Sequence, residues 1–537
     1  MTAFPSLAAV FLTYFDDIKG QSVLYYSSLP DIPEGTIEHA TLPSGLHNLS
    51  EDLICFRHHG RPGVGLFRSR EKPEGENRGR GRTMGVVGVV LEEGDVTNLY
   101  SSKSALEEIY DKLENLSQSP FISSAEQDGE RDKVLDEVWE TYRADKVRKL
   151  ETAIDEGKEN ELDRVHKLIT ERGRVPAVHP IAFMPLLLGI LGPNIVPVYK
   201  AALSGQRIVR LAFCFIPKLF IISTKKWQLL YSQPPILPLS ALAWNIWALS
   251  LPPRAALANG EAEISEWLGN VGLMDLDNVK AKKGGWVATT SDMIFKSHTK
   301  LYDIFIDLSS NPLPPTPVSS PSSFTSPSPI ILSTSTSPSS SSATPLTYTL
   351  PSLPLYRSLL LLTSSPPTIH AGMWKEGGWW LVIYELLEKV WKVCVGVCEF
   401  AAGRGNIGMQ GGGVRLQDGE EEEQLLDNAR EDDLLDLLEE AGDEAATVQG
   451  ESAPKPEEDE AVRQGRLILR QLFHHTYHLH SHLLSVLNGR PRGERSMGQL
   501  SDLEVKTLSG RWAGAQDAMF WRGVARRWGS IVDLDEE

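Results

Sequence analysis

The N-terminal part of the chain alternates between short apolar runs and polar turns. Residues 9–15 (AVFLTYF) and 22–26 (SVLYY) are rich in β-branched and aromatic side chains, and a polar DDIKG segment separates them. This pattern predicts a β-hairpin. A small sheet followed by helices indicates an α/β lobe over residues 1–177. Its other predicted elements are strands at Leu53–Phe56, Gly65–Arg68 and Met84–Leu91, then helices at Leu106–Leu116 and 131–172.

Two long uncharged runs, 181–199 and 229–253, open the next part of the chain. Each is long enough to raise the question of a membrane span. Both contain several prolines, however, and prolines break the hydrogen bonding that a spanning helix needs. We therefore expect both runs to lie in a protein core. The first is typical of a buried helical segment, and the LLYS that begins the second is typical of a strand. Residues 178–308 are thus predicted to form a second α/β lobe.

The composition changes sharply after this second lobe. From Ser309 onward the chain is rich in Ser, Pro and Thr, which cannot bury enough apolar surface to become ordered. Helical, Trp-rich sequence resumes near Tyr356. The predicted fold class is therefore α/β, with a mainly helical C-terminal region and two disordered inserts. The expected segments are a disordered linker at 309–355, a helical domain at 356–402 and 461–537, a Gly-rich then acidic disordered insert at 403–460, and flexible stretches at 70–82 and 118–130.

The charge of the chain is concentrated in one segment. The formal net charge is −18, and residues 416–460 carry 19 acidic and two basic side chains. The remainder is close to neutral, so no nucleic-acid-binding surface is expected. The four cysteines, Cys55, Cys214, Cys394 and Cys398, are too scattered for a disulfide framework or a zinc motif. No N-terminal targeting signal is evident, and we expect a cytoplasmic protein.

Sequence signatures of enzymes are absent. The chain has no GxxxxGK[ST] phosphate-binding loop, no HExxH zinc motif and no GxSxG nucleophile elbow. Gly60, Gly63 and Gly65 give a GxxGxG pattern, but it lacks the strand-then-helix context of a dinucleotide site. A turn leading into a strand is the favoured interpretation. We therefore expect no covalent catalysis and no cofactor.

The sharpest candidate for metal binding is the segment HHTYHLHSH at 474–482. On a helix, His474, His478 and His482 share one face, so three imidazoles can meet one ion. The alternative is a polar helix face, with neighbouring leucines and Phe473 packing inward. No acidic or cysteine ligand lies at motif spacing, and we favour the polar face. A metal-dependent enzyme is accordingly the most distant of the functional hypotheses.

Two segments in the predicted inserts are similar to docking motifs. The acidic insert repeats an Asp-Leu-Leu triplet, and such short apolar anchors suit transient binding to clathrin or adaptor-type partners. A solvated amphipathic helix that covers its own domain is the favoured alternative. The linker carries PLPPTP at 312–317, which in an extended polyproline form fits an SH3-type groove. The triplet residues are Asp433, Leu434, Leu435, Asp436, Leu437 and Leu438.

Three patches of sequence occur in an order that resembles a known family. The first is VFLTYFDDIKGQSVLYYSSLP (10–30), and the second is LPSGLHNLSEDLICFRHHGRPGVGLFRS (42–69). The third is LGPNIVPVYKAALSGQRI (191–208) taken with LLYSQPPI (229–236). Their order resembles the DENN module, most closely its LCHN-like branch. The resemblance covers residues 8–308 well and the C-terminal third loosely. It implies a longin-type N-terminal lobe, a central DENN lobe and a separate C-terminal helical region.

The resemblance also implies a function. DENN modules act in vesicle and membrane trafficking by guanine-nucleotide exchange on Rab-type small GTPases, with peripheral rather than integral membrane association. An exchange factor binds the nucleotide-free GTPase more tightly than the nucleotide-bound form, so release follows by coupling and needs no acid, base or metal. The resemblance supplies no contact residues. A trafficking scaffold without exchange activity is the runner-up hypothesis.

Residues 209–228 (VRLAFCFIPKLFIISTKKWQ) interrupt the third patch. One interpretation is a genuine insertion whose apolar runs form strands. The other is a retained intron: every valine codon begins with GT, a glutamine codon can end in AG, and the segment spans 20 whole codons. Because removing it joins Ile208 to Leu229 and restores a continuous strand, we favour the retained intron.

Overall fold

The computed structural model describes 19 parts of the chain, and all of them belong to one compact unit formed by Met1–Pro367 and Glu458–Glu537. Of the predicted Gly-rich and acidic insert at 403–460, residues 403–458 lie outside the described residues. The described residues are 4–71, 82–92, 96–116, 125–146, 165, 179–204, 227–232, 234–253, 265–282, 285–298, 301–310, 313–317, 330–337, 340–346, 348, 352–363, 459–490, 500–509 and 515–528.

A five-stranded antiparallel sheet forms the core of the first lobe, in the order β2-β1-β5-β4-β3. All five strands predicted from the sequence are found in it. Successive side chains of the central strand β1 enter different apolar clusters: Val10 and Leu12 join one, and Phe11 joins the other. The strands are β1 (Leu7–Asp16), β2 (Gly20–Ser28), β3 (Glu51–His58), β4 (Arg61–Glu71) and β5 (Arg82–Leu91).

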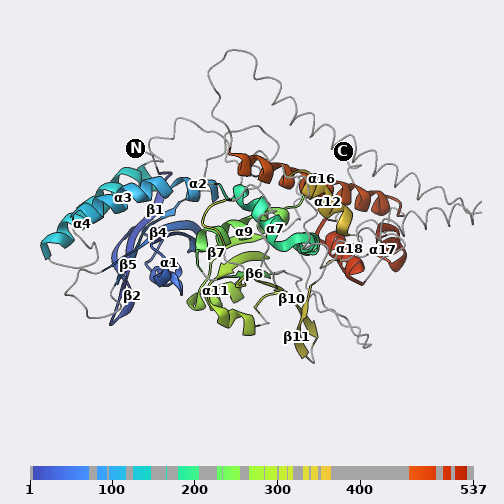
Figure 1. The fold of residues 1–537 in the computed structure, drawn as a ribbon, viewed down its shortest axis with the longest axis horizontal. Coiled ribbons are helices and arrows are strands. Elements are labelled where there is room, and N and C mark those ends of the chain that lie inside the picture. Colours follow the sequence, from blue (N-terminus) through green and yellow to red (C-terminus); the bar gives the residue numbers. More distant parts are fainter. Residues whose placement is uncertain are drawn as a thin grey trace, which may run out of the picture. The chain divides into compact units, whose positions relative to one another are not determined.

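Helices cover both faces of this sheet (Figure 1). The longer helices pack on one face, and short helical segments pack on the other. The predicted helix from Leu106 begins three residues earlier, and the predicted charged helix is described only in its first part. This arrangement is compatible with a longin-like lobe. The helices are α1 (Ile37–Thr41) and η1 (Leu46–Asn48) on one face, and α2 (Val96–Ser101), α3 (Lys103–Leu116) and α4 (Ala125–Tyr142) on the other.

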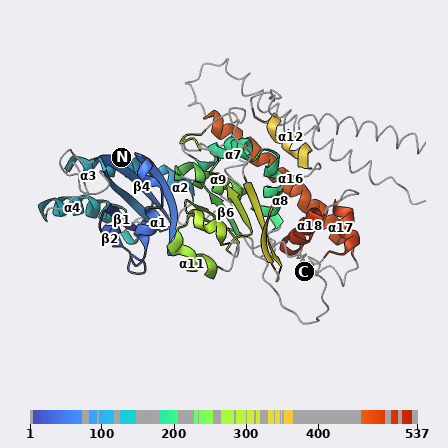
Figure 2. The ribbon, with the colours of Figure 1, turned by 60° about the horizontal axis from the view of Figure 1, so that its bottom comes forward.

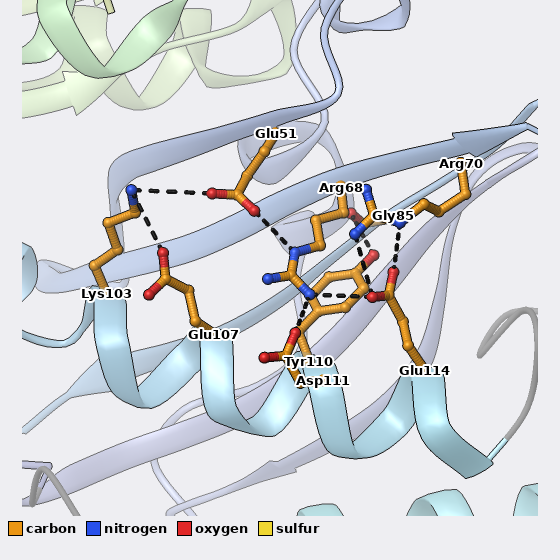
Figure 3. Close-up of polar contacts among 9 residues, drawn as sticks. All are labelled: Glu51, Arg68, Arg70, Gly85, Lys103, Glu107, Tyr110, Asp111 and Glu114. Atoms are coloured by element: carbon orange, nitrogen blue, oxygen red, sulfur yellow. Dashed lines mark hydrogen bonds and ion pairs between the residues drawn. The ribbon is translucent and has the colours of Figure 1, made fainter. Parts of the chain in front are cut away.

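An ionic cluster around the buried Arg68 attaches α3 to the sheet (Figure 3). Arg68 of β4 is 7% exposed. Its guanidinium donates to Asp111 Oδ1 at 2.6 Å, Glu114 Oε2 at 3.1 Å and Glu51 Oε2 at 2.9 Å. It also lies over the ring of Tyr110, 4.8 Å from its centroid. Burial disfavours the charge, but the carboxylate bonds outweigh it and raise the pKa of Arg68. The cluster therefore fixes the position of α3 along β4.

The second lobe contains a six-stranded sheet in the order β11-β10-β9-β6-β8-β7. Strands β9, β6, β8 and β7 are parallel, and β10 and β11 extend the sheet as an antiparallel hairpin. The predicted strand at LLYS is β6. The strands are β6 (Trp227–Tyr231), β7 (Glu266–Asn270), β8 (Trp286–Thr290), β9 (Ile304–Asp307), β10 (Ile330–Ser337) and β11 (Ser340–Pro345).

Apolar helices pack against the second sheet, and their burial confirms that both uncharged runs are protein core. Pro180–Ser204 is long and apolar enough to cross a membrane by length and composition alone, yet 78% of its most apolar window is buried inside the fold. Short helices also follow β7 and β8. The helices are η2 (Pro180–Phe183), α7 (Met184–Leu191), η3 (Gly192–Asn194), α8 (Ile195–Ser204), α9 (Ile236–Leu249), η4 (Leu273–Asp275), α11 (Leu276–Ala281) and η5 (Met293–Ser297).

The structure corrects the prediction of a disordered linker at 309–355. Within that range, β10 pairs with β9, and Ile331 is buried at 3% exposure. A Ser/Thr-rich strand can be held by backbone hydrogen bonds to an existing sheet edge. Composition alone cannot reveal such an edge, because the edge is supplied by β9.

The C-terminal helices pack directly on the second lobe, whereas the resemblance implies a separate region (Figure 2). The Tyr199 hydroxyl of α8 donates to Leu472 O at 3.2 Å and lies 2.7 Å from Thr476 Oγ1. A Cβ atom on Gly465 would lie 2.1 Å from Ile181 O, so the contact requires glycine there. These helices are α12 (Leu353–Leu361), α16 (Glu460–Asn488), α17 (Asp502–Ser509) and α18 (Ala515–Trp528).

Candidate functional site

The two lobes are joined where β3 of the first meets α9 of the second. Helix α9 begins after Pro235, which supplies no side-chain cap. Asp52 of β3 takes that role: Oδ2 accepts from Ile236 N at 2.6 Å, and Oδ1 accepts from Leu237 N at 3.2 Å. Asp52 is only 6% exposed, and burial raises its pKa to about 6 despite the backbone hydrogen bonds that favour the charged form. The carboxylate therefore fixes the start of α9 against the first sheet.

Strands β3 and β7 make the second contact between the lobes. Arg57 Nε donates to Trp267 O at 2.7 Å and lies 3.4 Å from Glu266 Oε1. Gly269 has φ +70°, and a Cβ atom there would lie 2.4 Å from Cys55 O. Only glycine tolerates both this conformation and this approach of one backbone to another. The junction is therefore built from backbone contacts as well as side chains.

The turn between β3 and β4 lies beside this junction. His59 and Gly60 form a two-residue connection, with φ of +48° and +81°. Positive φ at both positions is the geometry of a type I′ hairpin turn, in which Asn, Asp or Gly is usual and histidine is strained. The GxxGxG pattern was predicted to be a turn leading into a strand, and this is confirmed, because Gly60 lies in the turn and Gly63 and Gly65 lie in β4.

A cavity of about 320 Å³ opens between the lobes at this turn. The first lobe contributes α1 and the β3–β4 turn, and the second contributes the end of β7, η4 and α11. Helix α11 lies close to α1 in both views of the ribbon (Figures 1 and 2). The polar lining residues are Thr36, Arg57, His58, His59, Asn270, Asp275, Asn278 and Lys282.

The charges around the cavity are largely balanced within the protein. Glu266 is paired with both Arg57 and Lys282. Burial lowers the pKa of His58 to about 4, so the ring is neutral near pH 7 and its Nε2 donates to Pro33 O at 3.0 Å. Burial raises the pKa of Asp275, whose Oδ2 accepts from Gly272 N at 2.9 Å. Ion pairs and hydrogen bonds within the protein thus satisfy several of the polar groups that line the cavity.

The histidine segment is placed on α16, away from the junction. His474 and His478 are exposed, whereas His480 is 4% exposed and packs edge-on against Trp528. His482 makes a similar contact with Trp521. Within the described ranges, no group of three or more His, Cys, Asp or Glu side chains is placed to hold a metal ion. The predicted polar face with leucines packing inward matches this placement, since Leu472 and Leu483 are buried.

Other predicted motifs fall partly or wholly beyond the described residues. The Asp-Leu-Leu repeat at 433–438 lies outside them, as does the interrupting segment from 209 to 226. Of the PLPPTP segment, residues 313–317 are described, and Leu313 is buried at 6% exposure. The inter-lobe cavity was not predicted, because its lining comes from four separate segments of the chain. The RHHGR run at the end of β3 was the local feature that could have drawn attention to it.

Comparison with known families identifies the family of this chain. The family model of DENN domain-containing protein 11 matches residues 10–318. The chain belongs to this DENN-domain family. The matched range includes both sheets from β1 to β9, together with the Asp52 cap and the inter-lobe cavity. It ends before α12 and the C-terminal helices. The DENN resemblance read from the three sequence patches is thereby confirmed at the level of the family.

One curated relative shares a long aligned region with this DENN-domain protein. It is the uncharacterized protein ANR2 of Saccharomyces cerevisiae, 25% identical over 331 residues. The alignment covers 57% of this chain and 58% of the yeast protein. The chain therefore matches little more than half the length of that relative.

Proposed function

We propose that this protein is a guanine-nucleotide exchange factor, or a regulator, of a Rab-type small GTPase in vesicle and membrane trafficking. Membership of the DENN-domain family supports this proposal, since the family acts on such GTPases. The observation that carries it furthest is the junction itself. The residues that the family match covers include both sides of this junction and the residues that line the cavity.

The geometry fits a binding mechanism. An exchange factor must present a rigid surface that favours one conformation of the GTPase over another. The Asp52 cap and the close approach of Gly269 to Cys55 hold the two lobes in one arrangement. A GTPase seated over the cavity would contact both lobes at once. Its nucleotide-free form would then be stabilised without a catalytic acid, base or metal from this chain.

A nucleotide-release assay tests the proposal. The full-length protein is added to a panel of Rab-type GTPases loaded with fluorescent GDP, and release is followed over time. We expect at least one member to release GDP faster in proportion to added protein. No acceleration across the panel, with retained pull-down of trafficking proteins, would favour the scaffold without exchange activity.

Three finer assignments belong to the same proposal. We infer membership of the LCHN-like branch from the order of the three sequence patches, and peripheral membrane association from the trafficking role. The Asp433–Leu438 repeat and the PLPPTP segment remain proposed sites for clathrin or adaptor-type and SH3-type partners. Deleting each segment separately and measuring pull-down of such partners, with GDP release as the internal control, tests the two sites independently.

A further inference from the structure

Four large apolar side chains gather on the outside of the second lobe, next to the cavity. Leu273 and Met274 belong to η4 and are 43% and 56% exposed. Met293 and Ile294 belong to η5 and are 58% and 49% exposed. Elements η4 and η5 follow the carboxyl ends of β7 and β8, which are neighbouring parallel strands. We call these four residues the apolar patch. Adjacent exposed apolar side chains are typical of protein-binding surfaces, and methionine adapts well to a partner.

The two halves of the patch lie side by side. A Cβ atom built on Gly272, which precedes η4, would lie 3.9 Å from Asp275 Oδ2 and 4.0 Å from Asp292 Oδ2. Asp292 immediately precedes η5, so the two short helices begin within a few ångströms of each other. Asp275 also lines the inter-lobe cavity. The patch is therefore continuous with the candidate site.

The charge around the patch is unevenly matched. Three described lysines near the patch are each paired with a carboxylate: Lys280 with Asp277, Lys296 with Asp307, and Lys282 with Glu266. Asp292, by contrast, has no side-chain hydrogen bond or ion pair to any residue that the structure describes. Asp275 is bonded only to the backbone of Gly272 within the same residues. Within the described residues, the edge of the patch thus carries two carboxylates, those of Asp275 and Asp292, that form no ion pair with a described cation.

We propose that the apolar patch, with Asp275 and Asp292 at its edge, is the surface of the second lobe that docks the GTPase. The complementary surface on the partner consists of apolar side chains flanked by lysine or arginine. Apolar contacts supply most of the affinity, and the acidic edge accelerates and orients the encounter. This inference rests on the proposed exchange function, to which it adds the contact residues and the chemistry of the partner's surface.

Replacing both methionines tests the apolar part. Met274→Gln with Met293→Gln keeps the length of the side chains and makes them polar. With the most responsive GTPase of the panel, we expect the GTPase concentration for half-maximal exchange to rise at least about tenfold. The thermal midpoint should not change, because both side chains are already largely exposed. Leu503→Gln on α17, where the leucine is 75% exposed, is the matched control and should leave exchange unchanged.

Asp292→Lys tests the acidic edge. The association rate of the GTPase should fall, and its dependence on salt should weaken, because a favourable long-range attraction is removed. If the wild-type protein promotes exchange and both variants match it in half-maximal concentration and association rate, the docking surface is elsewhere. If the wild-type protein promotes no exchange, the proposed function fails first and this assignment of the partner fails with it.

Discussion

A single carboxylate, Asp52, connects the first sheet to the start of α9. Three backbone N–H groups, of Leu53, Ile236 and Leu237, donate to it. These bonds favour the ionised form and burial opposes it. Burial prevails, since the pKa rises from 3.8 to about 6. At pH 7 the carboxylate is therefore ionised, and burying its charge costs part of the free energy that the three bonds provide.

The pKa of Asp52 makes the free energy of unfolding depend on pH, because it differs between the folded and unfolded protein. Between its unfolded and folded pKa values, Asp52 binds a proton more tightly in the folded protein. Its contribution to the free energy of unfolding is thus largest below pH 4 and declines by about 3 kcal/mol as the pH rises through 6. Asp52→Asn cannot titrate, so its urea midpoints measured from pH 4 to 7 should lack this decline. Curves for wild type and Asp52→Asn that run parallel would contradict the prediction.

At the scale of an element, strand β6 contains the end of the segment 209–228, which interrupts the third patch of sequence. The strand begins at Trp227, two residues before the predicted junction at Leu229. Gln228 is 2% exposed between β8 and β9, and its Oε1 has no hydrogen-bond partner among the described residues. A buried amide oxygen without a partner costs about 1–3 kcal/mol. In a chain lacking 209–228, Ile208 would occupy this position, which suits an aliphatic side chain.

Deletion of residues 209–228 should therefore raise the thermal midpoint of unfolding, because it replaces the unpaired amide by isoleucine and leaves a short connection after α8. Gln228→Ile in the full chain should give part of the same gain. Transcript reads that pass directly from the Ile208 codon to the Leu229 codon would identify the shorter chain as the natural product. A deletion variant that unfolds at a lower temperature, with no such reads, would show that the segment is an integral insertion.

The elements differ in how far the sequence could predict them. Strands β1 to β5 were all predicted, because their sequences are rich in β-branched and aromatic residues and are separated by polar turns. Strands β7 and β8 (EWLGN and WVATT) were missed: each has five residues and is buried nearly throughout, so neither has the polar–apolar alternation that marks a strand. The hairpin of β10 and β11 depends on the edge of β9, and no local pattern encodes that.

At the scale of the whole molecule, a substitution at the junction between the lobes tests whether their arrangement matters for function. Gly269→Ala places a Cβ atom against Cys55 O and forces a residue with φ +70° out of its preferred range. We expect a loss of at least about 2 kcal/mol in unfolding free energy and reduced GDP release, with far-UV circular dichroism little changed. Gly129→Ala on α4, where a Cβ atom meets nothing within 4 Å, is the control and should stabilise the protein by about 0.5–1 kcal/mol. Unchanged GDP release in Gly269→Ala would show that the exchange function does not depend on the junction.

The candidate site shows the same division between local and long-range information. The family, the two lobes and the turn at Gly60 could be inferred from local patterns. The cavity could not, because Arg57 and Lys282 are brought together only when β3 packs against β7. The absence of catalytic motifs in the sequence directed attention to binding, but placing the surface required the fold.

The bond from Tyr199 to Leu472 joins residues 273 positions apart in the chain. At a synthesis rate of roughly 5–20 residues per second, about 15–50 s pass on the ribosome between the two. Throughout that interval the apolar helices from Pro180 to Ser204 lack the cover that α16 gives them. A nascent chain in this state is a natural client for chaperones. A premature stop codon between residue 318 and α16 should therefore yield a product that quality control removes, even though such a stop leaves the whole family-matched region intact.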